Sequence, residues 1–195
     1  MKKIIAIFLS VLAVVAIFGF AACNNEGGKE ETPAVTITDS SEILTKVWAA
    51  YTAEATEDEM FAAIGGDVDN YESNEPGTKF DIAHEGFTSM MVFPADAVSQ
   101  IDDAAAIIHM MNANTFTAGA YRTVEGTDIA ALTESIKANI QSNHWMCGFP
   151  EKFVIFNLEG YIVSAFGNGV LIDNFAAKLT ATYPTATLAV SEAIV

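Results

Sequence analysis

The stretch FVIFNLEGYIVSAF, residues 153–166, decides the fold of this chain. It contains two apolar runs, Phe153 to Asn157 and Tyr161 to Phe166, which are rich in the aromatic and β-branched residues that favour strands. Glu159-Gly160 lies between the runs, and a short turn between apolar runs predicts a β-hairpin. The sheet is therefore predicted to be antiparallel or mixed.

On the C-terminal side of this hairpin, we expect one helix and one further strand. Asn168 is predicted to cap the helix, which should end before Pro184 because proline disfavours helical geometry in the residue before it. Residues 187–195 are predicted to form a final strand. The apolar face of the helix is predicted to consist of Leu171, Ile172, Phe175 and Leu179.

On the N-terminal side, two strand–helix pairs are predicted. Residues 87–93 should form a strand, followed by a helix that starts at Pro94, and residues 116–123 should form another strand. Thr127 or Asp128 should cap the next helix. The two helices are predicted to bury Val98, Ile101, Ala105, Ile108 and Met111, and then Ile129, Leu132, Ile136 and Ile140.

The domain itself should begin at Asp39, which has the spacing of a capping box with Glu42. Ile43, Leu44, Val47, Trp48 and Tyr51 then follow at helical spacing. A second, short helix is predicted from Thr56 through Ile64. Residues 67–86 form a long irregular stretch, and a loop of this length in a small domain is usually functional or disordered.

This order of elements predicts an α+β domain, in which helices cover a mixed or antiparallel sheet of about four to five strands. From Phe87 to Leu179 the order also resembles the thioredoxin fold, in which a proline precedes the hairpin strands, as Pro150 does here. The position of that family's redox cysteines reads Phe93-Pro94-Ala95-Asp96 here. The resemblance therefore implies a thioredoxin-like topology without thiol redox chemistry.

The first 23 residues, MKKIIAIFLSVLAVVAIFGFAAC, are typical of an export signal: a positive start, an apolar middle and small residues at the end. Ala21-Ala22-Cys23 resembles the lipobox of bacterial lipoproteins, which implies that Cys23 carries lipid. Phe20 stands where that motif usually has leucine. We therefore expect a signal peptide at 1–22, a lipidated Cys23 with a flexible tether at 23–38, and one α+β domain at 39–195.

Removal of the signal peptide takes away Lys2 and Lys3, so the formal net charge falls from −16 to −18. Such acidity excludes nucleic acid as a partner. If Cys23 carries lipid, Cys147 has no partner for an intrachain disulfide. The expected location is the outer side of the cell membrane, with the chain anchored through Cys23.

Cys147 and His144 are the most suggestive residues for catalysis, because a cysteine nucleophile needs a nearby base. The alternative is a buried, inert thiol beside a loop histidine. A zinc site would need two further ligands, for example His84 or His109. No sequence motif requires a cofactor.

Other candidates are residues that could bind a ligand or Ca²⁺. Asp67, Asp69, Glu72 and Glu75 could supply oxygen ligands, although the sixth and twelfth positions of an EF-hand loop do not fit. Arg122, the only arginine, could clamp a carboxylate or pair with an acid on a neighbouring strand. Tyr71 and Trp145 could line a ligand groove.

Taken together, the sequence predicts a membrane-anchored extracytoplasmic lipoprotein that is a non-catalytic module for an unknown protein or small ligand. The alternative is a thioredoxin-like or cysteine-dependent enzyme that uses Cys147 and His144. A transporter's substrate-binding subunit is less favoured, because one domain of this length lacks the two lobes that close on a ligand.

Overall fold

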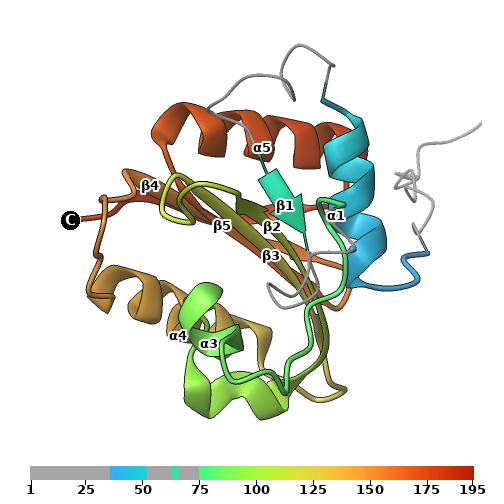
Figure 1. The fold of residues 1–195 in the computed structure, drawn as a ribbon. Helices are drawn as coiled ribbons and strands as arrows, with labels where there is room; N and C mark the ends of the chain where they lie inside the picture. Colours follow the sequence, from blue (N-terminus) through green and yellow to red (C-terminus); the bar gives the residue numbers. More distant parts are fainter. Residues whose placement is uncertain (1–35, 52–62, 66–74) are drawn as a thin grey trace, which may run out of the picture. The chain divides into compact units, whose positions relative to one another are not determined.

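The computed structural model describes residues 36–51, 63–65 and 75–195, all within the unit Pro33–Val195 (Figure 1). The signal peptide, Cys23 and most of the tether lie outside the described residues. So do Asp67, Asp69, Tyr71 and Glu72.

The centre of the domain is a six-stranded sheet in which every neighbouring pair is antiparallel. The α+β prediction, with an antiparallel sheet covered by helices, is therefore confirmed. The spatial order is β1 (Ala63–Gly65), β2 (Ile101–His109), β3 (Phe116–Thr123), β5 (Tyr161–Gly167), β4 (Lys152–Leu158) and β6 (Thr187–Ala193).

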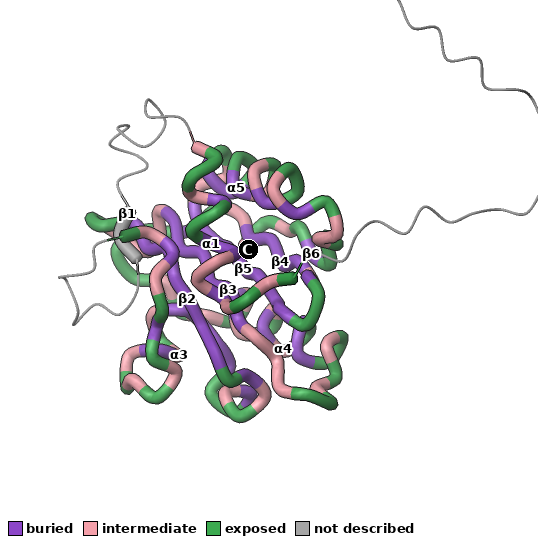
Figure 2. The backbone as a smooth tube through the Cα atoms, turned by 90° about the vertical axis from the view of Figure 1, so that its right-hand side faces the viewer, coloured by how far each residue is buried: buried purple, intermediate pink, exposed green. Residues whose placement is uncertain are grey.

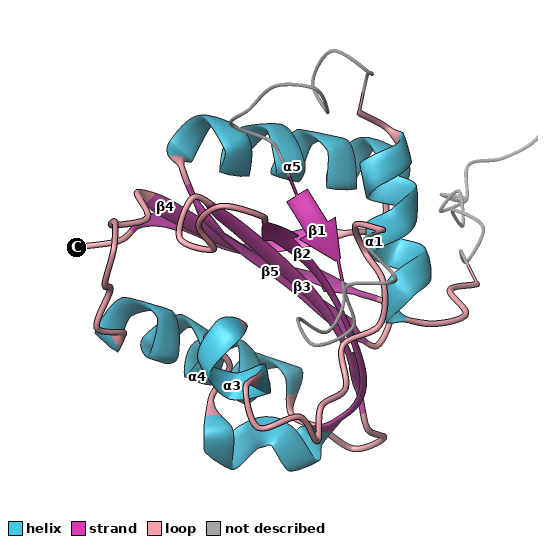
Figure 3. Cartoon of the chain, viewed as in Figure 1, coloured by secondary structure: helices cyan, strands magenta, loops and turns pink. Residues whose placement is uncertain are grey.

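Helices cover both faces of this sheet (Figures 1 and 3). One face packs against α1 (Ser40–Ala49) and α5 (Gly169–Thr182). The other packs against α3 (Phe87–Met90), the 3₁₀ helix η3 (Ala95–Gln100) and α4 (Ile129–Ser142). The strands between these layers are the most buried part of the chain, as Figure 2 shows.

Strand periodicity divides the core between the two faces. In β5, Val163 and Ala165 point to the α1–α5 side, whereas Ile162 and Phe166 point to the α4 side. All of β5 is buried, because it lies inside the sheet and is covered on both faces. Its continuous apolar sequence follows from this position.

The predicted hairpin is confirmed as β4–β5, with Leu158 paired to Tyr161 across a two-residue turn. Glu159 and Gly160 have φ values of 45° and 85°, the left-handed geometry that such hairpin turns require. The predicted caps are also confirmed. The side chains of Asp39, Asp128 and Asn168 accept backbone N–H groups at the starts of α1, α4 and α5.

The region between residues 87 and 111 differs from its prediction. The predicted strand at 87–93 is α3 and a turn, and the predicted helix after Pro94 is η3 followed by β2. Nearly all of β2 is buried, and an apolar run buried on both sides has no period that separates a strand from a helix. The thioredoxin-like alternative is therefore wrong, because its first strand is a helix. The helix predicted through Ile64 is also wrong there, since Ile64 lies in β1.

Candidate functional site at one end of the sheet

Four strands place their ends together at one edge of the domain. β2 and β5 end there, and β3 and β4 begin there, because all neighbouring pairs are antiparallel. Three segments meet at this edge: residues 110–115 between β2 and β3, residues 143–151 before β4, and residues 168–170 at the start of α5. We call these three segments the sheet-end face.

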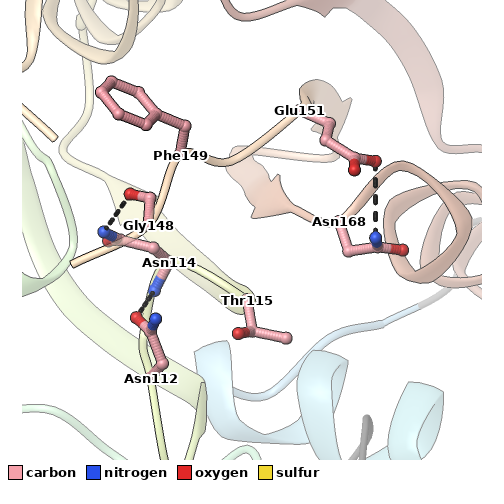
Figure 4. Close-up of a pocket in the computed structure, with 7 residues that line it drawn as sticks. All are labelled: Asn112, Asn114, Thr115, Gly148, Phe149, Glu151 and Asn168. Atoms are coloured by element: carbon pink, nitrogen blue, oxygen red, sulfur yellow. Dashed lines mark hydrogen bonds between the residues drawn. The ribbon is translucent and has the colours of Figure 1, made fainter. Parts of the chain in front are cut away.

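Two asparagine side chains hold the first two segments together, and Figure 4 shows one of these contacts, from Asn114 to Gly148. The amide of Asn112 donates to the carbonyl of Cys147 at 2.7 Å. The amide of Asn114 donates to the carbonyls of Met146 and Gly148 at 2.7 and 2.9 Å. These contacts fix a loop in which Cys147 has φ 62°, a left-handed conformation uncommon for residues other than glycine.

A buried histidine supports the turn that carries these asparagines. His109, at the end of β2, accepts the backbone N–H groups of Met111 and Asn112 through Nδ1, each at 3.3 Å. An imidazole nitrogen that accepts carries no proton, so the geometry places the proton of a neutral ring on Nε2. Asn112 in turn accepts the N–H of Asn114 at 2.9 Å, which closes the turn.

The third segment is attached through Thr115 and Glu151. The backbone N–H of Asn168 donates to the Thr115 carbonyl at 2.8 Å. The Glu151 carboxylate accepts the backbone N–H of Gly169 at 2.8 Å and the side-chain amide of Asn168 at 3.4 Å. A pocket of about 230 Å³ opens between the segments. It is lined by Asn112, Asn114, Thr115, Gly148, Phe149, Glu151 and Asn168 (Figure 4).

Large apolar side chains are exposed around this pocket. Phe149 is 80% exposed, and Met111 and Met146 are 79% and 77% exposed. Met110 and Val170 in the same three segments are also exposed. Residues 110–115 and 143–150 contain no Asp, Glu, Lys or Arg, in a chain with 34 such residues. Charge depletion together with aromatic and methionine side chains is characteristic of the core of a protein interface.

The structure places the Cys147–His144 pair on this face. Both side chains are exposed, so the expectation of a buried Cys147 thiol is wrong. The hydrogen bonds from Asn112 and Asn114 fix this loop and hold Cys147 away from the core. Trp145 in the same loop packs its ring 5.1 Å from that of Phe166, and its indole nitrogen is buried with no hydrogen-bond partner among the described residues.

The other candidates lie elsewhere. Arg122 pairs with Asp102 at 2.6 Å, the structural alternative considered above, and this carboxylate raises the pKa of Arg122 above its ordinary value. Glu75 is exposed, and His84 lies in the turn before α3. Within the described ranges, no group of three His, Cys, Asp or Glu side chains could hold a metal ion.

Beside Arg122, Asp103 in β2 ties the sheet to the start of α1. It accepts the backbone N–H of Ser40 at 2.8 Å and pairs with Lys79 at 3.2 Å. Burial alone would raise the pKa of Asp103, but these partners outweigh it and hold the pKa below its ordinary value. We interpret this cluster as structural, because each of its charges has a partner within the fold.

Sequence reasoning missed Asn112, Asn114, Phe149 and Glu151, and it placed Met111 on a buried helix face. The available signal was the absence of charge from residues 110–115 and 143–150. Comparisons with protein-family models, with curated proteins and with solved structures found no match to this chain.

Proposed function

We propose that this protein is a lipid-anchored extracytoplasmic binding module that docks a partner protein on the sheet-end face. The observation that carries the proposal is the gathering of exposed Met110, Met111, Met146 and Phe149 on loops without charged residues. Methionine adapts its shape to a partner, and aromatic side chains are frequent binding hot spots.

The rigidity of these loops supports binding rather than a solvated surface. The side chains of Asn112 and Asn114 fix three consecutive carbonyls, from Met146 to Gly148. A loop ordered before binding loses less conformational entropy when a partner arrives. The pocket amides are thus engaged mainly in holding the loop that presents Met146 and Phe149.

The position of the face favours a protein over the lipid surface as the partner. Residues 36–39 lead into α1, whose first backbone N–H, at Ser40, is bound by Asp103 near the start of β2. The sheet-end face begins just after His109, roughly 20 Å further along that strand. A tether leading to Cys23 would therefore join the domain at the opposite end. No helix in the described residues is long and apolar enough to cross a membrane.

Site-specific photo-crosslinking on intact cells tests the docking face. We expect p-benzoylphenylalanine in place of Phe149 to give a discrete light-dependent adduct, which the additional change Met146→Ser weakens. The matched control replaces Leu188, which is 52% exposed and pairs with Phe156 in β4, away from the face. Equal adducts at both positions, or none at position 149, would contradict the proposal.

The anchor has a separate test. Cys23→Ser should abolish labelling by radioactive palmitate and move the protein out of the membrane fraction, whereas Cys147→Ser should change neither. A Cys23→Ser protein that stays in the membrane fraction would show that Cys23 is not the anchor.

A further inference from the structure

We infer that the pocket of the sheet-end face receives a basic side chain, arginine or lysine, from the partner protein. This inference rests on the proposed function, because it names the chemistry by which the same face would recognise its partner. It is carried by the hydrogen-bond donors and acceptors of the pocket lining.

The side-chain NH₂ groups that line the pocket all have hydrogen-bond partners within the fold. The NH₂ group of Asn112 donates to Cys147, and that of Asn114 donates to both Met146 and Gly148. The NH₂ group of Asn168 faces Glu151 at 3.4 Å. Because carbonyl or carboxylate partners face these nitrogens, the orientations of the three amides are fixed.

Three side-chain oxygen atoms of the pocket lining have no hydrogen-bond partner among the described residues. Within the described part of the chain, Oδ1 of Asn114, Oγ1 of Thr115 and Oε1 of Glu151 take part in no hydrogen bond. An anion would meet the Glu151 carboxylate and few free donors. Guanidinium and ammonium groups carry only donors, so they complement this set of oxygens.

The charge of the pocket lining and the volume of the pocket both fit a single basic side chain. Neither lysine nor arginine lines the pocket, and the neighbouring Lys152 is paired with Asp173 at 2.5 Å. The pocket, about 230 Å³, is smaller than the roughly 300–1,000 Å³ of a typical small-molecule site. Phe149 at its rim offers an apolar surface for the methylene stem of the incoming side chain.

The net charge of this chain favours a partner whose surface is basic. The chain has a formal net charge of −16, so a second copy of it would be repelled, whereas a basic surface would be attracted. The charge-free loops would then contact apolar residues that flank the arginine or lysine.

A pair of peptides differing in one charge tests the inference on the full chain in detergent micelles. The probes are acetyl-Leu-Arg-Leu-amide and its citrulline counterpart, which has nearly the same shape and no charge. We expect the arginine peptide to shift the NMR signals of the Asn112, Asn114 and Asn168 side-chain amides and to bind at least about tenfold more tightly than the citrulline peptide.

Glu151→Gln should bring arginine binding down to the citrulline level, because it removes the charge and keeps an acceptor for the Gly169 N–H. Asp81→Asn, an exposed acid in a different hollow, is the matched control and should change nothing. If Glu151→Gln does not fold, Thr115→Val removes a second acceptor and should weaken arginine binding.

Equal binding of the two peptides, or no shift with either, would overturn the inference. The proposed docking function would still be judged separately, by crosslinking at position 149. A failure of the basic-side-chain inference and a failure of the proposed function are therefore distinguishable.

Discussion

Gly119 in β3 lies where the fold leaves no room for a Cβ atom. It lies in an interior strand, and a Cβ atom placed there would overlap the hydroxyl and ring of Tyr121 and the terminal methyl of Met91. Gly119→Ala should therefore lower the free energy of unfolding by about 2 kcal/mol or more, measured by urea denaturation.

The matched control for Gly119→Ala is Gly126→Ala, where a Cβ has open space and only the positive φ of 85° opposes the change, at about 1 kcal/mol. Adding Tyr121→Phe to Gly119→Ala should restore part of the loss, because it removes the overlapping hydroxyl. Strict additivity of the two changes would argue against this packing account.

Within the candidate site, the hydrogen bonds of Asn114 should contribute to stability and to the order of the loop at 146–149. Asn114→Asp keeps the shape, removes both donated hydrogen bonds and puts an anion beside the carbonyls of Met146 and Gly148. We expect a loss of about 1–3 kcal/mol and faster amide hydrogen exchange in residues 146–149. Asn174→Asp adds the same charge at an exposed position of α5 and should leave that exchange unchanged.

The Asn112 and Asn114 contacts also show why sequence did not reveal the site. They join residues 32 to 35 positions apart through side-chain amides and backbone carbonyls, and a backbone carbonyl is present in every residue type. The residue type of Cys147 suggests chemistry from sequence alone, whereas its exposure depends on these long-range contacts. The residue types of the loops were visible, but their proximity was not.

At the scale of elements, the start of α1 predicts how stability depends on pH. Hydrogen bonds from Lys46 and from the hydroxyl and backbone N–H of Thr38 lower the pKa of Glu42 to about 2. A free glutamate has a pKa of about 4.3. The unfolded chain therefore binds this proton first as the pH falls, and the stabilisation present above about pH 4.5 is lost towards pH 2.

Glu42→Gln should consequently cost about 1 kcal/mol at pH 7, the usual net value of a hydrogen bond, and almost nothing at pH 2. Urea denaturation from pH 2 to 7 measures this difference. Glu134→Gln, on an exposed position of α4, is the control and should show little difference at either pH. A constant Glu42→Gln effect across this range would contradict the assignment.

Elements with a clear period or a capping residue were predictable, and β2 was not. α4 and α5 combine an N-cap with apolar residues at helical spacing, and the structure reproduces both. In β2, Ala104-Ala105-Ala106 and Ile107-Ile108 are buried on both sides, so neither a period of two nor one of 3.6 stands out. Its strand state is set by pairing with β3, a tertiary interaction.

At the scale of the whole molecule, acidic residues greatly outnumber basic ones. Lys46, Lys79, Arg122, Lys137 and Lys152 each pair with a carboxylate. Lys178 lies over the Tyr51 ring, 5.6 Å from its centre. Every lysine and arginine in the described residues is thus engaged, and the remaining carboxylates repel one another.

This imbalance predicts that salt stabilises the fold. The screening length falls from about 30 Å at 0.01 M salt to about 10 Å at 0.1 M, which weakens long-range repulsion more than the close ion pairs. We expect Tm to rise by a few degrees between these concentrations, because about 1 kcal/mol corresponds to roughly 2–4 °C in a domain of this size. The double change Glu125→Gln with Glu134→Gln, at two exposed acids, should raise Tm at low salt and reduce the salt response. A Tm that falls with salt would mean that the ion pairs outweigh the repulsion, and it would remove the electrostatic reason for a basic partner.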